Sequence, residues 1–84
     1  MNTEDIMPKL TKFVGQYVNI SEITNDLDLF ASGRVNSLFA MQLVLFVEKE
    51  FGFKVENEDL DYENFKSIDA ILGFIQRKLA APAA

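Results

Sequence analysis

A turn-forming stretch that ends in a serine holds the residues of this sequence that are best suited to chemistry. Residues 33–38 read GRVNSL and lead into an almost wholly apolar segment. Gly33 supplies backbone freedom for a turn. Asn36 and Ser37 are both good helix N-caps, but one helix start uses only one of them. If Asn36 is the cap, the Ser37 hydroxyl faces water at the positive end of the helix dipole, where an anion such as a phosphate binds well.

The alternative is that Ser37 merely caps or borders the helix, which is the ordinary role of a serine at a helix start. The wider sequence favours the first interpretation. Its pattern consists of Asp28-Leu29-Phe30, Gly33, Asn36-Ser37-Leu38, Leu43, Val47 and Glu48-Lys49-Glu50-Phe51. With this spacing, the chain resembles the acyl carrier proteins from about residue 6 to residue 79.

In that family, the serine of an Asp-Ser-Leu motif carries a 4′-phosphopantetheine arm, whose thiol holds an acyl group as a thioester. The resemblance implies that Ser37 is the attachment residue and that Leu38 matches the leucine after it. Asn36 stands where the family usually has Asp, so the site keeps a capping side chain and lacks a negative charge. This difference bears on how the modifying transferase recognises the site.

The composition excludes several kinds of catalysis. The chain has 84 residues, which fit one domain, residues 1–84, with one modest core. It contains no cysteine and no histidine, which excludes thiol catalysis, histidine bases, disulfides and the usual zinc sites. Enzymes can run on carboxylates alone, but a chain this short offers little room for a pocket, so we expect no catalytic residues and no metal site. A carrier fits better than an enzyme, because its reactive thiol belongs to a prosthetic group.

The chain is acidic, with 13 acidic residues against 8 basic ones and a net charge of −5. Seven of the 13 acidic residues lie between Glu48 and Glu63. This charge argues against binding to nucleic acid or to anionic membranes, both of which require basic surface. The acidic side chains either keep the protein soluble or also steer it toward basic patches on partner enzymes.

No targeting or membrane segment is visible. Glu4 and Asp5 stand where a secretory signal would be basic, and no apolar stretch follows them. The longest unbroken apolar run, residues 43–47, is far too short to span a membrane. We expect a cytoplasmic monomer.

The first helix is predicted from apolar residues that recur every three or four positions. It begins near Thr3 or only at Met7, because Thr3 is a possible cap and Pro8 belongs in a first turn. Its apolar face consists of Ile6, Leu10, Phe13, Val14 and Tyr17. A long connection over residues 18–36 follows, and such loops are usually functional or held down by their own apolar residues. The candidate anchors are Ile20, Ile23, Leu27, Leu29 and Phe30.

The remaining sequence predicts three more helices. One runs from Ser37 to Phe51 and ends at Gly52 as C-cap, and a short, irregular one covers residues 57–65. The last helix is capped by Ser67 and reaches residue 79, and residues 79–84 are expected to form a disordered tail. The predicted fold is all-α, a bundle of three longer helices and one short helix with a long loop between the first and second.

The helix after Ser37 has more apolar surface than one core contact requires. Its predicted core face consists of Phe39, Leu43, Phe46 and Val47. The opposite side carries Ser37, Leu38, Met41, Gln42, Leu45 and Glu48. The large apolar side chains among them, Leu38, Met41 and Leu45, are either buried under the long loop or form a docking surface for partners. The family resemblance favours docking, because the helix after the modified serine is its main docking element.

Tyr62, Phe65 and Arg34 each allow two interpretations. Tyr62 and Phe65 either pack the acidic segment onto the bundle or line a groove for the acyl chain. Arg34, which lies just before the serine, is either solvated or meets a phosphate.

The functional hypothesis is a free-standing carrier of an acyl or extender-unit thioester, of the polyketide type. The Asn-Ser-Leu motif at residues 36–38 and the helix end at residues 46–51 resemble those of carriers of modified malonyl units. A discrete aminoacyl, peptidyl or fatty-acid carrier is an alternative, and an unmodified helical adaptor is an alternative of another class. The implied partners are a phosphopantetheinyl transferase and the loading, tailoring and acceptor enzymes.

Overall fold

The computed structural model describes residues 2–80, and every regular element among them is helical. Its four α-helices are α1 (Thr3–Val14), α2 (Ser37–Phe51), α3 (Tyr62–Phe65) and α4 (Ile68–Ala80). Two short 3₁₀ turns, η1 (Ile20–Glu22) and η2 (Asn57–Asp59), lie in the connections. The prediction of three longer helices and one short helix, with a long loop after the first, is confirmed.

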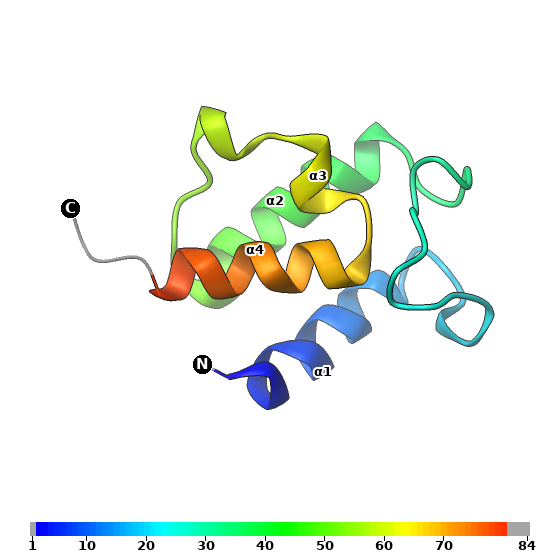
Figure 1. The fold of residues 1–84 in the computed structure, drawn as a ribbon, viewed down its shortest axis with the longest axis horizontal. Coiled ribbons are helices and arrows are strands. Elements are labelled where there is room, and N and C mark those ends of the chain that lie inside the picture. Colours follow the sequence, from blue (N-terminus) through cyan, green and yellow to red (C-terminus); the bar gives the residue numbers. More distant parts are fainter. Residues whose placement is uncertain (1, 81–84) are drawn as a thin grey trace.

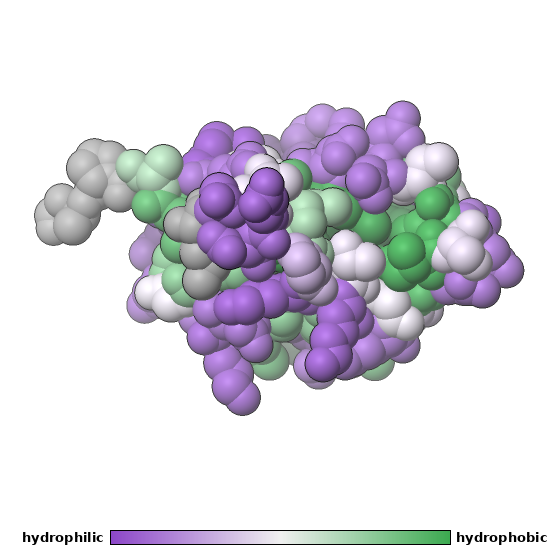
Figure 2. Space-filling view, turned by 90° about the horizontal axis from the view of Figure 1, so that it is seen from below, coloured by the Kyte–Doolittle hydropathy of each residue, from purple (hydrophilic) through white to green (hydrophobic). Residues whose placement is uncertain are grey.

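The helix α4 lies at the centre of the bundle and contacts each of the other three helices. Figure 1 shows α2 behind α4, with α1 and α3 on opposite sides of it. The connection from α1 to α2 gathers at one end of the molecule, and α2 begins there, close to α3 (Figure 1). Seen from the α1 side, the surface is mostly hydrophilic, and its hydrophobic part shows most at the end where that connection lies (Figure 2).

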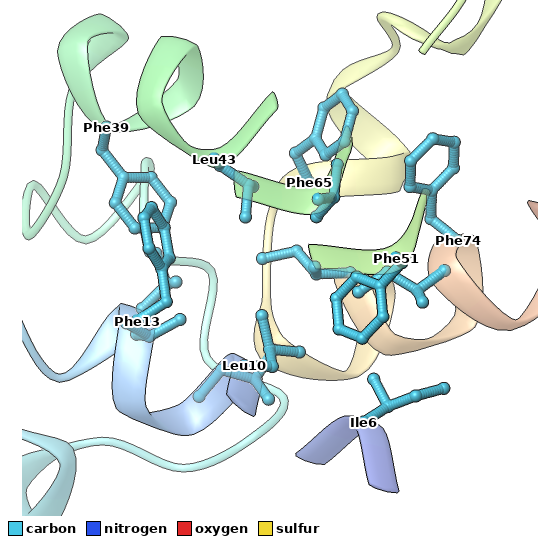
Figure 3. Packing of buried hydrophobic residues seen from close by; sticks show 14 of the residues in the cluster. Ile6, Leu10, Phe13, Phe39, Leu43, Phe51, Phe65 and Phe74 are labelled. Atoms are coloured by element: carbon cyan, nitrogen blue, oxygen red, sulfur yellow. The ribbon is translucent and has the colours of Figure 1, made fainter. Parts of the chain in front are cut away.

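The core is made by apolar side chains from all four helices and from the long connection. Figure 3 shows aromatic rings and aliphatic side chains of α1, α2, α3 and α4 directed toward one another. Its completely buried members include Ile6, Leu10, Val14, Leu29, Leu43, Val47, Ile71 and Ile75. Phe46 is only half-buried, because its ring lies at the edge of the core, stacked on Phe13 with ring centroids 4.4 Å apart. The predicted core face of α2 is otherwise confirmed.

The first helix begins at Thr3, and its cap is Asn2 and not Thr3. The Asn2 side chain accepts a hydrogen bond from the backbone N–H of Asp5, whose carboxylate accepts from the N–H of Asn2. The helix ends at Val14, so the prediction that Tyr17 belongs to its buried face is wrong. The Tyr17 side chain is 39% exposed, because the chain has already left the helix at Gly15.

The acidic segment differs from the single short helix that was predicted over residues 57–65. It is divided into η2 and α3, with Leu60 and Asp61 between them. The Asp61 side chain accepts from the N–H of Glu63 and thereby starts α3 as a new helix. At the other end, α4 extends through Leu79 and Ala80, so the prediction of a disordered tail is wrong for these two residues. Residues 81–84 lie outside the described residues.

Backbone hydrogen bonds attach the long connection to the second half of the chain. The N–H of Leu29 donates to the carbonyl of Lys66 over 2.7 Å, and the N–H of Asp69 donates to the carbonyl of Asn25 over 2.9 Å. Leu29 is fully buried, while the other predicted anchors are partly buried. The connection is therefore a fixed part of the fold, and it positions the residues that precede α2.

Candidate functional site

Asn36 caps α2, and Ser37 is its first helical residue. The Asn36 side-chain oxygen accepts hydrogen bonds from the backbone N–H of Leu38 over 3.0 Å and of Phe39 over 3.4 Å. Ser37 is exposed, and its hydroxyl makes no hydrogen bond to any residue within the described range 2–80. The Asn36 side chain therefore caps the helix, and the Ser37 hydroxyl stays accessible from solvent.

The turn before α2 is held by the buried Leu29. The carbonyl of Leu29 accepts from the N–H of Arg34 over 3.1 Å and of Val35 over 3.2 Å. Gly33 has a φ of 78°, a left-handed conformation in which a side chain would be strained. The Arg34 guanidinium lies 3.9 Å from the Glu22 carboxylate, a solvent-exposed pair that contributes little stability. Backbone geometry, and not this ion pair, thus sets the position of Ser37.

The electrostatic surroundings of Ser37 suit an anion. The first turn of α2 contains no acidic residue. The positive end of the helix dipole therefore meets no competing carboxylate on the helix itself. A phosphate group attached at Ser37 fits this environment.

The predicted docking residues follow Ser37 along the outer side of α2. Leu38, Met41 and Leu45 are 60%, 65% and 59% exposed, so the alternative that they are buried under the long loop is wrong. Gln42 is exposed as well. Glu48 is half-buried, and its carboxylate accepts from the backbone N–H of Val55 over 2.9 Å. Glu48 therefore helps to hold the segment after α2, while the three apolar side chains lie open to solvent.

An apolar groove opens between α2 and α3. It has a volume of about 300 Å³ and is lined by Phe30, Ala40, Met41, Val44, Leu60, Asp61, Tyr62 and Phe65. Met41 lies four residues after Ser37, about one helical turn. The sequence indicated Tyr62 and Phe65 as possible groove residues but gave no sign of Ala40, Val44 or Leu60. Their shared location depends on how the acidic segment folds back over α2.

The Tyr62 hydroxyl donates a hydrogen bond to the Asp28 carboxylate at the edge of this groove. The other oxygen of that carboxylate accepts from the N–H of Phe30 over 3.0 Å and of Ala31 over 2.8 Å. The N–H of Ala31, followed by the Tyr62 hydroxyl, holds the pKa of Asp28 below its ordinary value. The same hydrogen bond raises the pKa of Tyr62 to about 12. At neutral pH the donor is therefore a neutral phenol and the acceptor an ionised carboxylate.

Comparison with known proteins identifies the family to which this arrangement belongs. A family model described as a phosphopantetheine attachment site matches residues 9–75. The chain belongs to the acyl carrier protein family. The acyl carrier protein of Thermotoga maritima is 30% identical to it over 78 residues, which cover 90% of this chain and 94% of that protein. The acyl carrier protein of Thermosynechococcus vestitus is 25% identical over 83 residues, 96% of this chain and 100% of that one. No solved structure matches the chain with comparable significance.

Membership of the acyl carrier protein family establishes the general role of the chain. Its members are carriers and not enzymes, and their prosthetic group is 4′-phosphopantetheine. A phosphopantetheinyl transferase and enzymes that handle acyl groups are the partners that the family implies. No helix among residues 2–80 combines the length and the apolar character that crossing a membrane requires.

Proposed function

We propose that Ser37 is the residue to which the 4′-phosphopantetheine arm is attached. The observation that carries this proposal is that Asn36, and not Ser37, caps α2. The Ser37 hydroxyl therefore remains exposed and unpaired among the described residues. The absence of an acidic side chain in the first turn supports it further, because the attached phosphate is not repelled there. When bound, the arm supplies the thiol that holds the acyl group as a thioester.

Leu38, Met41 and Leu45 form the surface on which we propose that partner enzymes dock. Their exposure on the same side of α2 as Ser37 supports this role, because a partner that covers them also reaches the attachment site. A few large apolar anchors commonly carry most of the energy of such an interface. Gln42 and Glu48 border this surface, with Glu48 already engaged by the N–H of Val55.

The cargo that we propose is a small extender unit of the polyketide type, such as a modified malonyl group, carried in the cytoplasm. The support is the sequence itself: Asn36 in place of Asp, and the helix end at residues 46–51, resemble carriers of such units. A fatty-acid carrier and an aminoacyl or peptidyl carrier are the alternatives. These alternatives share the attachment chemistry at Ser37 and differ in the enzymes that load the arm.

Intact-mass spectrometry tests the attachment site. After incubation with coenzyme A and a broad-specificity phosphopantetheinyl transferase, the wild-type protein should gain the mass of one phosphopantetheine. Ser37→Ala should gain nothing while keeping its helical circular dichroism spectrum, and Ser32→Ala, which alters another exposed serine of the same turn region, should be modified like the wild type. A wild-type chain that no transferase modifies would favour the unmodified adaptor.

A loading competition tests the cargo. The modified protein is offered separately to an acyltransferase for substituted malonyl units, to a fatty-acid malonyl transferase and to an aminoacyl-adenylating enzyme. The proposal expects the highest kcat/KM with the first enzyme, since discrimination between carriers resides in that ratio. Preferential loading by either of the other two would assign the chain to the corresponding alternative.

A further inference from the structure

The hydrogen bond between Tyr62 and Asp28 joins two segments that lie 34 residues apart. One is the connection that leads to Ser37, and the other is the short helix α3. The Asp28 carboxylate contributes to both, because it also accepts from the N–H groups of Phe30 and Ala31. A single side chain therefore shapes the turn before α2 and holds the Tyr62 ring in place.

The rings of Phe30 and Tyr62 both belong to the wall of the apolar groove. The ring centroids of Phe30 and Tyr62 are 6.1 Å apart, within the range of favourable aromatic contact. Phe30 also packs edge-on against the buried Phe39 at 6.0 Å, which limits its movement. Tyr62, by contrast, is 49% exposed. Widening the groove on this side therefore requires the Tyr62 ring to swing outward, and that movement breaks its hydrogen bond to Asp28.

The rest of α3 is anchored independently of Tyr62. Asn64 accepts from the Arg77 guanidinium over 2.7 Å and donates to the carbonyl of Asp59 over 2.9 Å. Phe65 is buried, with its ring 5.2 Å from that of Phe74. Loss of the Tyr62 hydroxyl would therefore release one ring at the groove and leave the helix attached to α4.

We propose that the Tyr62–Asp28 hydrogen bond is a latch that keeps the groove narrow, and that Tyr62 is thereby a specificity-determining residue for the acyl group. With the latch closed, the groove of about 300 Å³ admits a short chain, since an apolar cavity of about half that volume holds a benzene ring. A long chain enters only when the Tyr62 ring moves away from Phe30. This inference rests on the proposed function, because the acyl group comes to the groove from an arm at Ser37.

Hydrogen exchange in the unmodified full-length protein tests the latch itself. Tyr62→Phe removes the donor and keeps the ring, and Tyr17→Phe is the matched control, because its ring packs on Phe13 and Phe39. Amides of Phe30 and Ala31 should exchange about two- to tenfold faster in Tyr62→Phe, the range expected for one net hydrogen bond. Tyr17→Phe should leave these rates unchanged. Equal rates at both amides in wild type and Tyr62→Phe would overturn the latch.

A transferase-independent probe tests chain selection. The sequence contains no cysteine, so Ser37→Cys gives a single thiol that can be alkylated with maleimides bearing a butyl or a dodecyl chain. The butyl chain should shift the NMR signals of Val44 and Phe65 both in Ser37→Cys alone and in Ser37→Cys combined with Tyr62→Phe. The dodecyl chain should shift them further only when Tyr62→Phe is also present. The same dodecyl shift with and without Tyr62→Phe would refute selection by Tyr62, whereas failure of the transferase to modify wild-type Ser37 would refute only the proposed function.

Discussion

The side-chain oxygen of Asn36 lies 3.0 Å from the backbone nitrogen of Leu38 and accepts its hydrogen. The cap thus reaches across the intervening residue, whose hydroxyl stays out of the hydrogen bonds that begin α2. The backbone of Asn36 is extended, with a φ of −138°, as expected for a residue that precedes the first helical turn. Capping of α2 and presentation of the candidate attachment hydroxyl are consequently carried out by two adjacent side chains.

This separation predicts different effects for substitutions at the two positions. Asn36→Ala should lower the free energy of unfolding by about 1 kcal/mol, because the N–H groups of the first turn lose their acceptor. Asn36→Asp should keep the cap and change that free energy by no more than about 1 kcal/mol. Ser37→Ala should change it by no more than about 0.5 kcal/mol, as is usual for an exposed side chain without partners. Urea denaturation followed by circular dichroism measures all three, and a loss in Ser37→Ala equal to that in Asn36→Ala would contradict this assignment of the cap.

The two sides of α2 should also respond differently to truncation. Leu43 is fully buried, so Leu43→Ala should cost about 2–5 kcal/mol of stability. Met41→Ala and Leu45→Ala remove exposed side chains and should cost no more than about 0.5 kcal/mol each. Both should slow transfer of cargo by a partner enzyme, since docking anchors typically contribute more than about 1 kcal/mol each. Unchanged transfer rates in both surface variants would place the docking surface elsewhere.

Periodicity identified the parts of this fold that depend on local sequence. The apolar residues of α1 and α2 recur at helical spacing, and both helices bury most of the face that this spacing predicts. Single residues also predicted two helix ends correctly. Gly52 ends α2 with a φ of 75°, and Ser67 accepts from the N–H of Ala70 at the start of α4. Tyr17 continued the pattern without belonging to the helix, because periodicity does not register where the backbone stops being helical.

The groove beside the candidate site could not be predicted in the same way. Its walls come from α2, from residues 60–65 and from Phe30 of the long connection, and their contact depends on tertiary packing. The Tyr62–Asp28 hydrogen bond likewise connects distant positions whose residue types have many other uses. Ser37 and its neighbours were visible in the sequence because the cap, the turn glycine and the apolar helix follow one another within a few residues. The groove has no such continuous signature.

The ion pair between Lys78 and Asp59 predicts an acid-dependent loss of stability. The ammonium of Lys78 donates to the Asp59 carboxylate over 2.8 Å, and this bond, together with the N–H of Glu56, holds the pKa of Asp59 below its ordinary value of 3.8. A depressed carboxyl pKa stabilises the folded state above 3.8, and this contribution is lost as the pH falls through the folded-state pKa. Lys78→Met should therefore be less stable than wild type at neutral pH, by about 1 kcal/mol, with the gap narrowing below pH 3.8. Urea denaturation across this pH range measures the gap, and the exposed Lys49→Met provides the control.

Alkaline titration of Tyr62 gives the complementary prediction. The chain has two tyrosines, so Tyr17→Phe leaves Tyr62 as the sole tyrosine for ultraviolet absorbance. Its pKa, raised to about 12 by the hydrogen bond to Asp28, should fall toward the ordinary value of 10.0 in Asp28→Asn, which removes the negative charge. Because the folded-state pKa is the higher one, the stabilisation is complete below 10.0 and is lost as the pH rises toward 12. The alkaline loss of stability should be smaller in Tyr62→Phe, and an unchanged titration midpoint in Asp28→Asn would show that Asp28 does not hold the Tyr62 hydroxyl in solution.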